Sequence, residues 1–554
     1  MKRQFKSMVE NFCHWETHTP DSIFLKQPHG TEFRDFSYQE AGQQIRKIAQ
    51  WLLSQNLPPR SNIGILSKNC AHWIMTDLAI SMAGHVSVPF YPTLTDEQLR
   101  QVLVHSDCQI LFVGKLDAWE SMKNGIPASI RCISYPSYYE GAPSEFENWE
   151  SIAQITPPLA SFALASYEEV SSIVYTSGTT GVPKGVMLTH QGLISALEHT
   201  REVGLLDTSN ARFFSYLPLC HIAERTLVES AGIASGGTIY FAESLDTFAS
   251  NLQTANPTHF LAVPRIWTKF QLGILAKLPQ SKLDLLLKIP VVKSIIRNKV
   301  KKGLGLAKAE LILTGAAPMP SSLLEWFHKL DIQIREAYGM TENMGVATMM
   351  PPKYKKGTVG KPHNGVTIKI DSNTQELLMK APWNTVGYYK EPIMTQELFK
   401  DGWLATGDMA SIDEDGYISI IGRVKDMFKS AKGEYIVPTP IEGMLAVNPI
   451  IEQVCVVGTG LPQPIALVVL SEIGKNTDEG QLCEVFREMI KRVNPHFKNY
   501  EHLRKIVVVK EAWSVENNML TPTLKIKRNV IEKHYQGQLE KWFESPEEIV
   551  FEKP

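Results

Sequence analysis

The feature that most constrains the fold is a regular alternation of short apolar runs and amphipathic segments between residues 60 and 115. The runs predict, in order, a strand (62–66), a helix (70–82), a strand (85–90), a helix that begins at a Thr95/Gln98 capping box, and a strand (109–114). Strand–helix–strand repeats form crossover units whose strands run parallel. Because similar apolar runs recur before residues 263, 315 and 339, the sequence predicts an α/β fold with largely parallel sheets.

The length of the chain requires more than one domain. Single hydrophobic cores stop growing at roughly 250–300 residues, and this chain has 554. After Gly422–Asp426 the pattern changes to short strands around one predicted helix at 481–493. We therefore expect a large N-terminal α/β domain, with mostly parallel sheets wrapped by helices, and a smaller α+β domain after it.

Composition excludes several classes of protein. The formal net charge is −2, so no overall positive field points to nucleic acid as a partner. The seven cysteines are scattered without a CxxC pair, which favours a reducing compartment over a disulfide framework or a zinc site. The N-terminus has no apolar core of a signal peptide, and the most apolar long window, 73–92, is broken by Asp77 and His85. We expect a cytoplasmic protein without a transmembrane helix.

One segment departs from this balance. Residues 277–308 carry nine basic side chains and one acid, Asp284, among apolar runs. A basic amphipathic segment of this kind can lie on the inner face of an anionic membrane as a peripheral contact. The alternative is a solvated pair of helices that covers the core.

A second segment, "YTSGTTGVPKG" at 175–185, combines three glycines, four serine or threonine side chains and one lysine. Backbone N–H groups in a glycine-rich turn bind oxyanions, and phosphate is the natural one. The segment is not a Walker loop, because Lys184 is followed by Gly185 and the flanking runs predict strands on both sides. A strand–loop–strand element suits closing over a triphosphate; a plain hairpin is the alternative.

Six further motifs follow the loop in a fixed order: "LPLCHIAER" (217–225), "LTGAAPMP" (313–320), "YGMTE" (338–342), "TGD" (406–408), "GRVKD" (422–426) and "LTPTLKIKR" (520–528). Together with the loop they resemble the signatures of the adenylate-forming acid:CoA ligase superfamily, and "VPRIW" (263–267) resembles its long-chain acyl-CoA synthetases. The resemblance implies ATP- and Mg²⁺-dependent activation of a long-chain fatty acid. An acyl-adenylate would form first, CoA would then take the acyl group, and AMP and pyrophosphate would be released.

The resemblance also implies roles for individual residues. It assigns to ATP, Mg²⁺ and CoA the residues Thr176, Ser177, Gly178, Thr179, Thr180, Gly181, Lys184, Gly315, Glu336, Tyr338, Gly339, Thr341, Glu342, Asp408, Arg423, Lys425, Lys429, Gly433 and Tyr435. The loop would hold the β- and γ-phosphates. Thr176 and Glu342 would hold the metal, Thr341 would contact the α-phosphate as part of the catalytic set, and Tyr338 would stack on adenine.

For the second half of the chain the resemblance implies a mobile domain. Asp408 and Arg423 would bind ribose, while Lys429, Gly433 and Tyr435 would meet CoA, an exposed strand edge being the alternative. Lys425 occupies the hinge position. The implied division is an N-terminal domain at 1–422, a hinge at 423–426 and a mobile domain at 427–554.

Three further residues are implied to act on the acid. Lys525 would be the catalytic lysine of adenylation, with Lys527 as the alternative. His221 would lie where the carboxyl end of the acid enters, although a lone histidine is often structural. Trp267 would gate the acyl tunnel, and a buried core tryptophan is the alternative.

Other functions remain open from the sequence. An amino-acid adenylation domain would present an aspartate to the substrate ammonium from the region after "LPL", whereas 220–230 offers Glu224 beside Arg225 and no aspartate. A fatty-acyl-AMP ligase would carry an insertion near the domain junction, and none is visible. A binding-only pseudo-enzyme would be expected to lose the loop, Glu342 or Lys525, and all are present.

Overall fold

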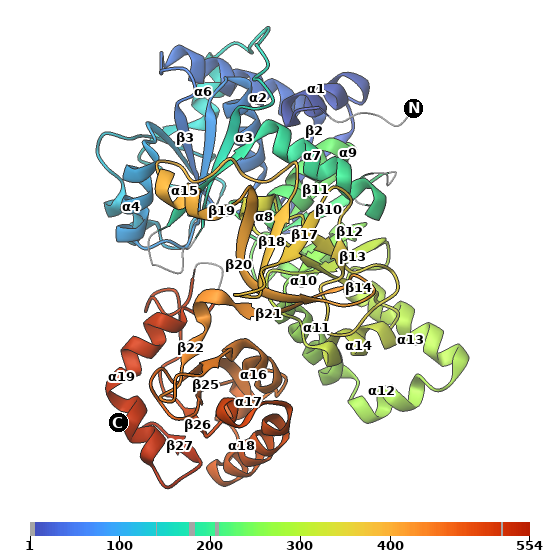
Figure 1. Ribbon diagram of the computed structural model, residues 1–554. Helices are drawn as coiled ribbons and strands as arrows, with labels where there is room; N and C mark the ends of the chain where they lie inside the picture. Colours follow the sequence, from blue (N-terminus) through green and yellow to red (C-terminus); the bar gives the residue numbers. More distant parts are fainter. Residues whose placement is uncertain are drawn as a thin grey trace. The chain divides into compact units, whose positions relative to one another are not determined.

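The computed structural model describes residues 6–139, 141–176, 183–204, 206, 210–521 and 525–553 (Figure 1). The chain divides into two compact units. The first comprises Met1–Lys355, Val359–Thr367 and Lys380–Leu404, and the second comprises Lys356–Thr358, Ile368–Met379 and Ala405–Pro554. The second unit thus begins, along the main chain, before the predicted hinge at 423–426.

A seven-stranded sheet in the first unit has the order β7-β6-β5-β3-β4-β8-β9. Its strands are β3 (Asn62–Leu66), β4 (Val86–Phe90), β5 (Ile110–Val113), β6 (Arg131–Ser134), β7 (Glu147–Asn148), β8 (Val170–Thr176) and β9 (Lys184–Thr189). All neighbours pair in parallel except β8 and β9. The predicted alternation over 60–115 is confirmed, and the Thr95/Gln98 capping box opens α4 (Asp96–Ser106).

A nine-stranded sheet, also in the first unit, has the order β16-β15-β14-β13-β12-β10-β11-β1-β2. Its strands are β1 (Ile23–His29), β2 (Glu32–Ser37), β10 (Arg212–Ser215), β11 (Thr238–Phe241), β12 (His259–Ala262), β13 (Leu311–Thr314), β14 (Ile334–Tyr338), β15 (Thr348–Met349) and β16 (Lys361–Pro362). The six strands from β14 to β1 pair in parallel, and the edge pairs are antiparallel.

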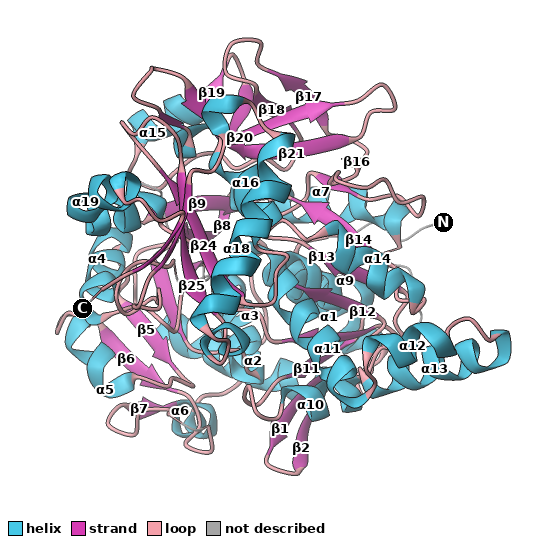
Figure 2. Ribbon diagram, turned by 90° about the horizontal axis from the view of Figure 1, so that it is seen from below, coloured by secondary structure: helices cyan, strands magenta, loops and turns pink. Residues whose placement is uncertain are grey.

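Helices wrap these sheets (Figure 2). They are α1 (Met8–His18), α2 (Tyr38–Ser54), α3 (Ala71–Met82), α4, α5 (Trp119–Met122), α6 (Trp149–Ile155), α7 (His190–Thr200), α8 (Ile222–Glu224), α9 (Ala231–Ser235), α10 (Phe248–Ala255), α11 (Pro264–Lys277), α12 (Gln280–Leu286), α13 (Pro290–Gly303), α14 (Ser321–Lys329) and α15 (Pro392–Leu398). Helix α3 has eleven buried residues among its twelve, which explains why its sequence is largely apolar around the whole helix. No helix in the described ranges is both long and apolar enough to cross a membrane.

The second unit is α+β, as the change of pattern predicts. It holds most of a five-stranded sheet with the path β17-β18-β20-β19 and β21 paired to β20, the hairpin β22-β23, and a four-stranded sheet β24-β25-β26-β27. These strands are β17 (Thr367–Ile370), β18 (Glu376–Lys380), β19 (Phe399–Lys400), β20 (Trp403–Ile412), β21 (Ile418–Arg423), β22 (Phe428–Lys429), β23 (Tyr435–Ile436), β24 (Ile451–Val457), β25 (Ile465–Leu470), β26 (Lys505–Val508) and β27 (Ile549–Phe551). Its helices are α16 (Pro438–Leu445), α17 (Glu472–Lys475), α18 (Glu479–Val493) and α19 (Arg528–Glu544).

Candidate active site

Two of the predicted motifs begin where neighbouring parallel strands end. Strand β13 leads into Gly315, strand β14 leads into Gly339, and Thr314 pairs in register with Glu336. Ligands of open α/β sheets bind beyond the carboxyl ends of the strands. The fold therefore brings "LTGAAPMP" and "YGMTE" to one edge of the nine-stranded sheet.

Glycine is required at both positions because backbone passes close by. A Cβ at Gly339 would lie 2.3 Å from the carbonyl carbon and oxygen of Gly345, and a Cβ at Gly315 would lie 2.9 Å from the carbonyl oxygen of Ala337. Contacts under 3 Å to backbone force the backbone to shift. These glycines allow the two loops to pack tightly at the sheet edge.

The turn after Gly339 holds the predicted metal carboxylate. Residues Thr341–Asn343 form one 3-10 turn that closes through the Asn343 side chain, whose Oδ1 accepts from the N–H of Met340 at 2.9 Å. Thr341 and Glu342 are buried, with 7% and 8% of their surface exposed. The Tyr388 hydroxyl donates to Glu342 Oε1 at 2.7 Å. This contact holds the carboxylate in one orientation.

Tyr388 also lies beside the predicted phosphate loop. Thr176 and Lys184 pair directly across the antiparallel strands β8 and β9, which confirms the strand–loop–strand prediction. The Lys184 ammonium lies 5.0 Å from the centre of the Tyr388 ring, a distance typical of a cation–π contact. Sequence reasoning missed Tyr388, which belongs to none of the predicted motifs. The predicted phosphate ligands Ser177, Gly178, Thr179, Thr180 and Gly181 lie outside the described residues.

Glu336 and Tyr338, the other ATP residues predicted in the first unit, lie on β14 and are partly buried. Burial raises the pKa of the Glu336 carboxyl to about 7. A carboxyl with such a pKa can gain or lose a proton near neutral pH. It therefore need not present a full negative charge to an anionic ligand.

His221 ends the loop that follows β10. Its ring Nδ1 accepts from the N–H of Ala223 at 3.2 Å, so His221 caps the short helix α8. Asn69 holds the loop: its amide donates to the Leu217 carbonyl at 2.6 Å and its Oδ1 accepts from Leu219 N–H at 3.0 Å. Sequence reasoning missed Asn69, because nothing in a sequence reports a contact made 148 residues away.

Glu224 also holds this loop, through hydrogen bonds to Tyr216 and Asn69. Its Oε1 accepts from the N–H of Tyr216 at 2.8 Å and from the Asn69 amide at 3.3 Å. Complete burial raises the pKa of this carboxyl to about 8. The neighbouring Arg225 forms a forked, buried ion pair with Asp77 at 3.0–3.1 Å. Both side chains of the "ER" pair are therefore engaged within the protein.

Trp267 is fully buried near the start of α11. Its indole N–H donates to the Ala262 carbonyl at 3.0 Å, and its ring centre lies 5.1–5.8 Å from those of Phe260, Phe270 and Phe327. This is the geometry of a core tryptophan, the alternative considered from the sequence. A role as a tunnel gate stays a prediction.

In the second unit, Asp408 and Arg423 face each other across the strand pair β20-β21. Arg423 Nε lies 2.8 Å from Asp408 Oδ1, and the carboxylate is buried whereas the guanidinium is exposed. The pairing brings together the two residues that the sequence assigns to ribose. Lys425 follows in a 3-10 turn, Val424–Asp426, and is exposed.

The three residues assigned to CoA share one hairpin. Lys429 and Tyr435 are a register pair of β22 and β23, and the Lys429 ammonium lies 4.9 Å from the Tyr435 ring centre. Gly433, in the connecting turn, has φ +82°, a left-handed conformation that favours glycine. Both side chains are exposed. The hairpin thus presents the Lys429 ammonium and the Tyr435 ring to solvent.

The two candidate lysines of adenylation differ in their surroundings. Lys525 is exposed, and its backbone is held by Thr521, whose N–H donates to the Lys525 carbonyl at 2.8 Å. Lys527 is partly buried, its ammonium lies 2.5 Å from Asn518 Oδ1, and burial lowers its pKa. Arg528 pairs with Glu442 at 2.6 and 2.9 Å and anchors the start of α19.

The oxygen donors of the site suit a metal ion that is held largely by the phosphates of a bound nucleotide. Among the described residues, no three His, Cys, Asp or Glu side chains gather as a metal site would require. Glu342 and the Thr176 hydroxyl offer oxygen donors of the kind that Mg²⁺ prefers, and Mg²⁺ commonly takes one or two carboxylates together with substrate phosphates. These residues fit Mg²⁺ brought in by a nucleotide.

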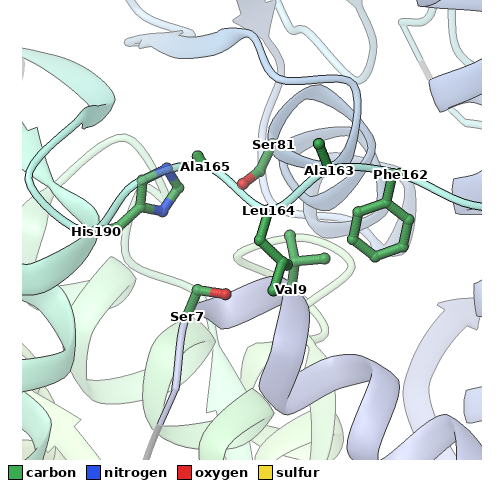
Figure 3. A pocket seen from close by; sticks show the side chains of 8 residues that line it. All are labelled: Ser7, Val9, Ser81, Phe162, Ala163, Leu164, Ala165 and His190. Atoms are coloured by element: carbon green, nitrogen blue, oxygen red, sulfur yellow. The ribbon is translucent and has the colours of Figure 1, made fainter.

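A pocket elsewhere in the first unit is lined by Ser7, Val9, Ser81, Phe162, Ala163, Leu164, Ala165 and His190 (Figure 3). His190 follows the last residue of β9, whereas Lys184 is the first residue of that strand. The pocket therefore lies at the opposite end of β9 from the loop, and none of the predicted site residues lines it.

A loop carried between antiparallel strands, motif turns at the carboxyl ends of parallel strands and a separate α+β unit together define an enzyme of the adenylate-forming class. The model of the family described as AMP-binding enzyme matches residues 12–389, and that of the AMP-binding enzyme C-terminal domain matches residues 425–547. The chain belongs to the AMP-binding enzyme family.

Curated relatives match over nearly the whole chain. A long-chain-fatty-acid–CoA ligase of Mycobacterium bovis is 28% identical and covers 95% of each chain. Long-chain-fatty-acid–CoA ligase 5 of Rattus norvegicus is 29% identical over 93% of this chain and 85% of its own.

Solved structures share the fold. The o-succinylbenzoate CoA synthetase of Bacillus subtilis, in complex with its acyl-adenylate intermediate, has a TM-score of 0.75 at 20% identity and covers 95% of this chain and 98% of its own. The adenylation domain of a carboxylate reductase from Mycobacterium chelonae has a TM-score of 0.80 at 20% identity, with 98% and 92% covered.

Proposed function

We propose that this enzyme is an AMP-forming long-chain fatty acid:CoA ligase that uses ATP, Mg²⁺ and CoA. The observation that carries the proposal is the Lys184–Tyr388–Glu342 contact, which joins a phosphate-loop cation to a buried metal carboxylate in the first unit. The relatives named as long-chain-fatty-acid–CoA ligases, which extend over nearly the whole chain, support the choice of substrates.

The reaction has two steps, each of which breaks one bond and forms another. A carboxylate oxygen of the fatty acid attacks the α-phosphorus of ATP, and pyrophosphate leaves with the electron pair of the broken P–O bond. The CoA thiolate then attacks the acyl carbonyl carbon, and AMP leaves. Activation divides one difficult condensation into two easier displacements.

In the first step the residues of the first unit bring two anions together. Lys184 and the loop hold the β- and γ-phosphates, and Thr341 contacts the α-phosphate. Glu342, oriented by Tyr388, and Thr176 would hold Mg²⁺, which when bound neutralises phosphate charge. Tyr338 stacks on adenine beside Gly339, and Gly315 and Glu336 line the nucleotide site.

His221 receives the carboxyl end of the acid, and Trp267 borders the acyl chain. Asn69 and Glu224 hold the loop that carries His221.

The second unit supplies different residues to each step. Asp408 and Arg423 bind ribose, and Lys525 neutralises the reacting oxygens during adenylation. The exposure of Lys525 and the engagement of Lys527 with Asn518 support this choice. The domain at 427–554 turns about the hinge at 423–426, with Lys425 as the pivot, and brings the Lys429–Gly433–Tyr435 hairpin to CoA.

The contacts of Glu224 argue against amino-acid adenylation. The α-ammonium of an amino acid needs an acidic partner beyond β10. Glu224 is buried, its Oε1 already accepts from two N–H groups, and burial raises the pKa of its carboxyl to about 8, so it is a poor partner for an ammonium. Asp77 is paired with Arg225. A neutral acyl tail needs no such partner.

The test is pyrophosphate release over a panel of saturated fatty acids from acetate to palmitate, with and without CoA. Each buried methylene contributes about 0.8 kcal/mol, so a four-carbon difference should change kcat/KM by more than about tenfold. Equal activity along the panel, or a maximum on short aromatic acids, would contradict a long-chain ligase.

We also place the enzyme in the cytoplasm, in peripheral contact with the inner face of a membrane through residues 277–308. The cysteine content and the exposed lysines of that segment support this localisation.

A further inference from the structure

Residues 277–308, here called the α12–α13 surface, concentrate positive charge in a protein whose net charge is close to zero. The surface carries nine basic residues and one acid, whereas the whole chain has a net charge of −2. Helices α12 and α13 project from the rest of the first unit (Figures 1 and 2). The charge is therefore presented outward on a protruding element.

Most of this charge is not neutralised by the protein. Lys301 pairs with Asp331 at 2.6 Å, and Arg297 donates to the Lys329 carbonyl. The ammonium groups of the other seven lysines of the surface form no ion pair or hydrogen bond with any residue that the structure describes. The one acid, Asp284, accepts from Gln280 at 2.9 Å. An anionic partner would meet unpaired ammonium groups.

The same segment also exposes large aliphatic side chains to solvent. Leu285, Ile289, Val291 and Ile295 expose 61%, 48%, 72% and 59% of their surface. Val291 and Ile295 lie one turn apart on α13, so they share a face. The opposite face of α13, with Ile296 and Val300, packs against the core. The core therefore does not explain the exposed pair.

We propose that the α12–α13 surface binds an anionic lipid bilayer, with Val291 and Ile295 inserted between headgroups and the surrounding lysines on lipid phosphates. Aliphatic side chains ringed by lysines are the pattern of helices that lie in the membrane interface. Nucleic acid fits less well, because single-strand sites stack bases on aromatic rings and residues 277–308 contain none.

The inference extends the proposed function by naming the surface from which a membrane-dissolved fatty acid would reach the enzyme. The delivery of fatty acid rests on the proposed function, whereas binding of the surface to lipid can be tested without ATP or substrate. Failure of lipid binding would leave the ligase activity standing, and failure of the activity would leave the lipid contact standing.

The test is co-sedimentation of the full chain with vesicles of phosphatidylcholine alone or with 30% phosphatidylserine. The wild type should bind only the anionic vesicles and should dissociate at 0.5 M salt. The triple variant Lys288→Gln, Lys299→Gln, Lys302→Gln should bind on the order of 100-fold more weakly at low salt. The double variant Val291→Ser, Ile295→Ser should lose about tenfold or more.

Matched controls separate this surface from net charge and general hydrophobicity. Lys491→Gln with Lys533→Gln and Lys541→Gln makes the same charge change on α18 and α19. Leu245→Ser with Ile393→Ser removes apolar groups elsewhere that are at least as exposed. Both controls should bind as the wild type does. Equal losses in controls and surface variants would overturn the proposal, as would unchanged binding by the surface variants. A concentration-dependent dimer that the Val291/Ile295 variant abolishes, without lipid binding, would assign the surface to a second copy instead.

Discussion

Replacing Tyr388 by Phe removes the hydroxyl that binds Glu342 and keeps the aromatic ring. The hydroxyl donates to Glu342 Oε1 at 2.7 Å, and Tyr388 is 7% exposed. A hydrogen bond to a charged group contributes about 1.5–3 kcal/mol, which corresponds to about 10- to 150-fold in a rate. If Glu342 holds Mg²⁺, the adenylation step should fall by this factor and should need more Mg²⁺ for half-maximal rate.

ATP–pyrophosphate exchange at varied Mg²⁺ measures the adenylation step alone. Tyr388→Phe keeps the ring that contacts Lys184. Tyr388→Leu also removes the ring, so its adenylation rate should be lower than that of Tyr388→Phe. The neighbouring Tyr389 provides the matched control, since its hydroxyl contacts the exposed Asp107 at 3.1 Å, and Tyr389→Phe should stay within about threefold. An unchanged exchange rate in Tyr388→Phe, or equal losses in Tyr388→Phe and Tyr389→Phe at equal thermal stability, would show that the Tyr388 hydroxyl does not support Glu342 in adenylation.

The remaining predictions concern the motif turn, the buried acid and the adenylation lysine. Gly339→Ala should lower the free energy of unfolding by about 1–3 kcal/mol, because its Cβ meets the Gly345 backbone at 2.3 Å, whereas Gly273→Ala, with no atom within 4 Å, should not; equal thermal unfolding of the two would contradict the close packing. The pKa of the Glu224 carboxyl is raised to about 8 in the folded state, so the folded protein keeps this proton at pH values where the unfolded chain loses it. The free energy of unfolding should therefore decline between about pH 4.5 and about pH 8 by up to about 1.4 kcal/mol per pH unit. Denaturant titration of Glu224→Gln should give a shallower decline, and an unchanged slope would count against a buried, protonated Glu224. Lys525→Ala should slow adenylation by about 10²–10³ and barely affect the reaction of supplied acyl-adenylate with CoA, while a larger loss of adenylation in Lys527→Ala would reassign the lysine.

The elements that sequence predicted well are those set by local rules. The alternation over 60–115 and the helix at 481–493 reappear as β3-α3-β4-α4-β5 and α18, because period and capping act over a few residues. The motif glycines follow the same logic: Gly315 and Gly339 mark points where backbone approaches backbone.

Contacts made across the fold were beyond prediction. Tyr388 reaches Glu342 over 46 residues, and Asn69 reaches the His221 loop over 148. Neither residue belongs to a motif, and each acts through a side chain that packing of the whole unit positions. The spacing to Arg528 favours Lys525 over Lys527 in the sequence, whereas the different burial of the two lysines could be read only from the structure.

The two-step ligase reaction is tested most directly by a single turnover of the enzyme with ATP, Mg²⁺ and palmitate, quenched before and after CoA is added. Without CoA, one equivalent of palmitoyl-adenylate and one of pyrophosphate should accumulate per enzyme, and CoA should then convert the adenylate to palmitoyl-CoA and AMP. Formation of ADP and phosphate, or the absence of any adenylate until CoA is present, would contradict the two-step reaction.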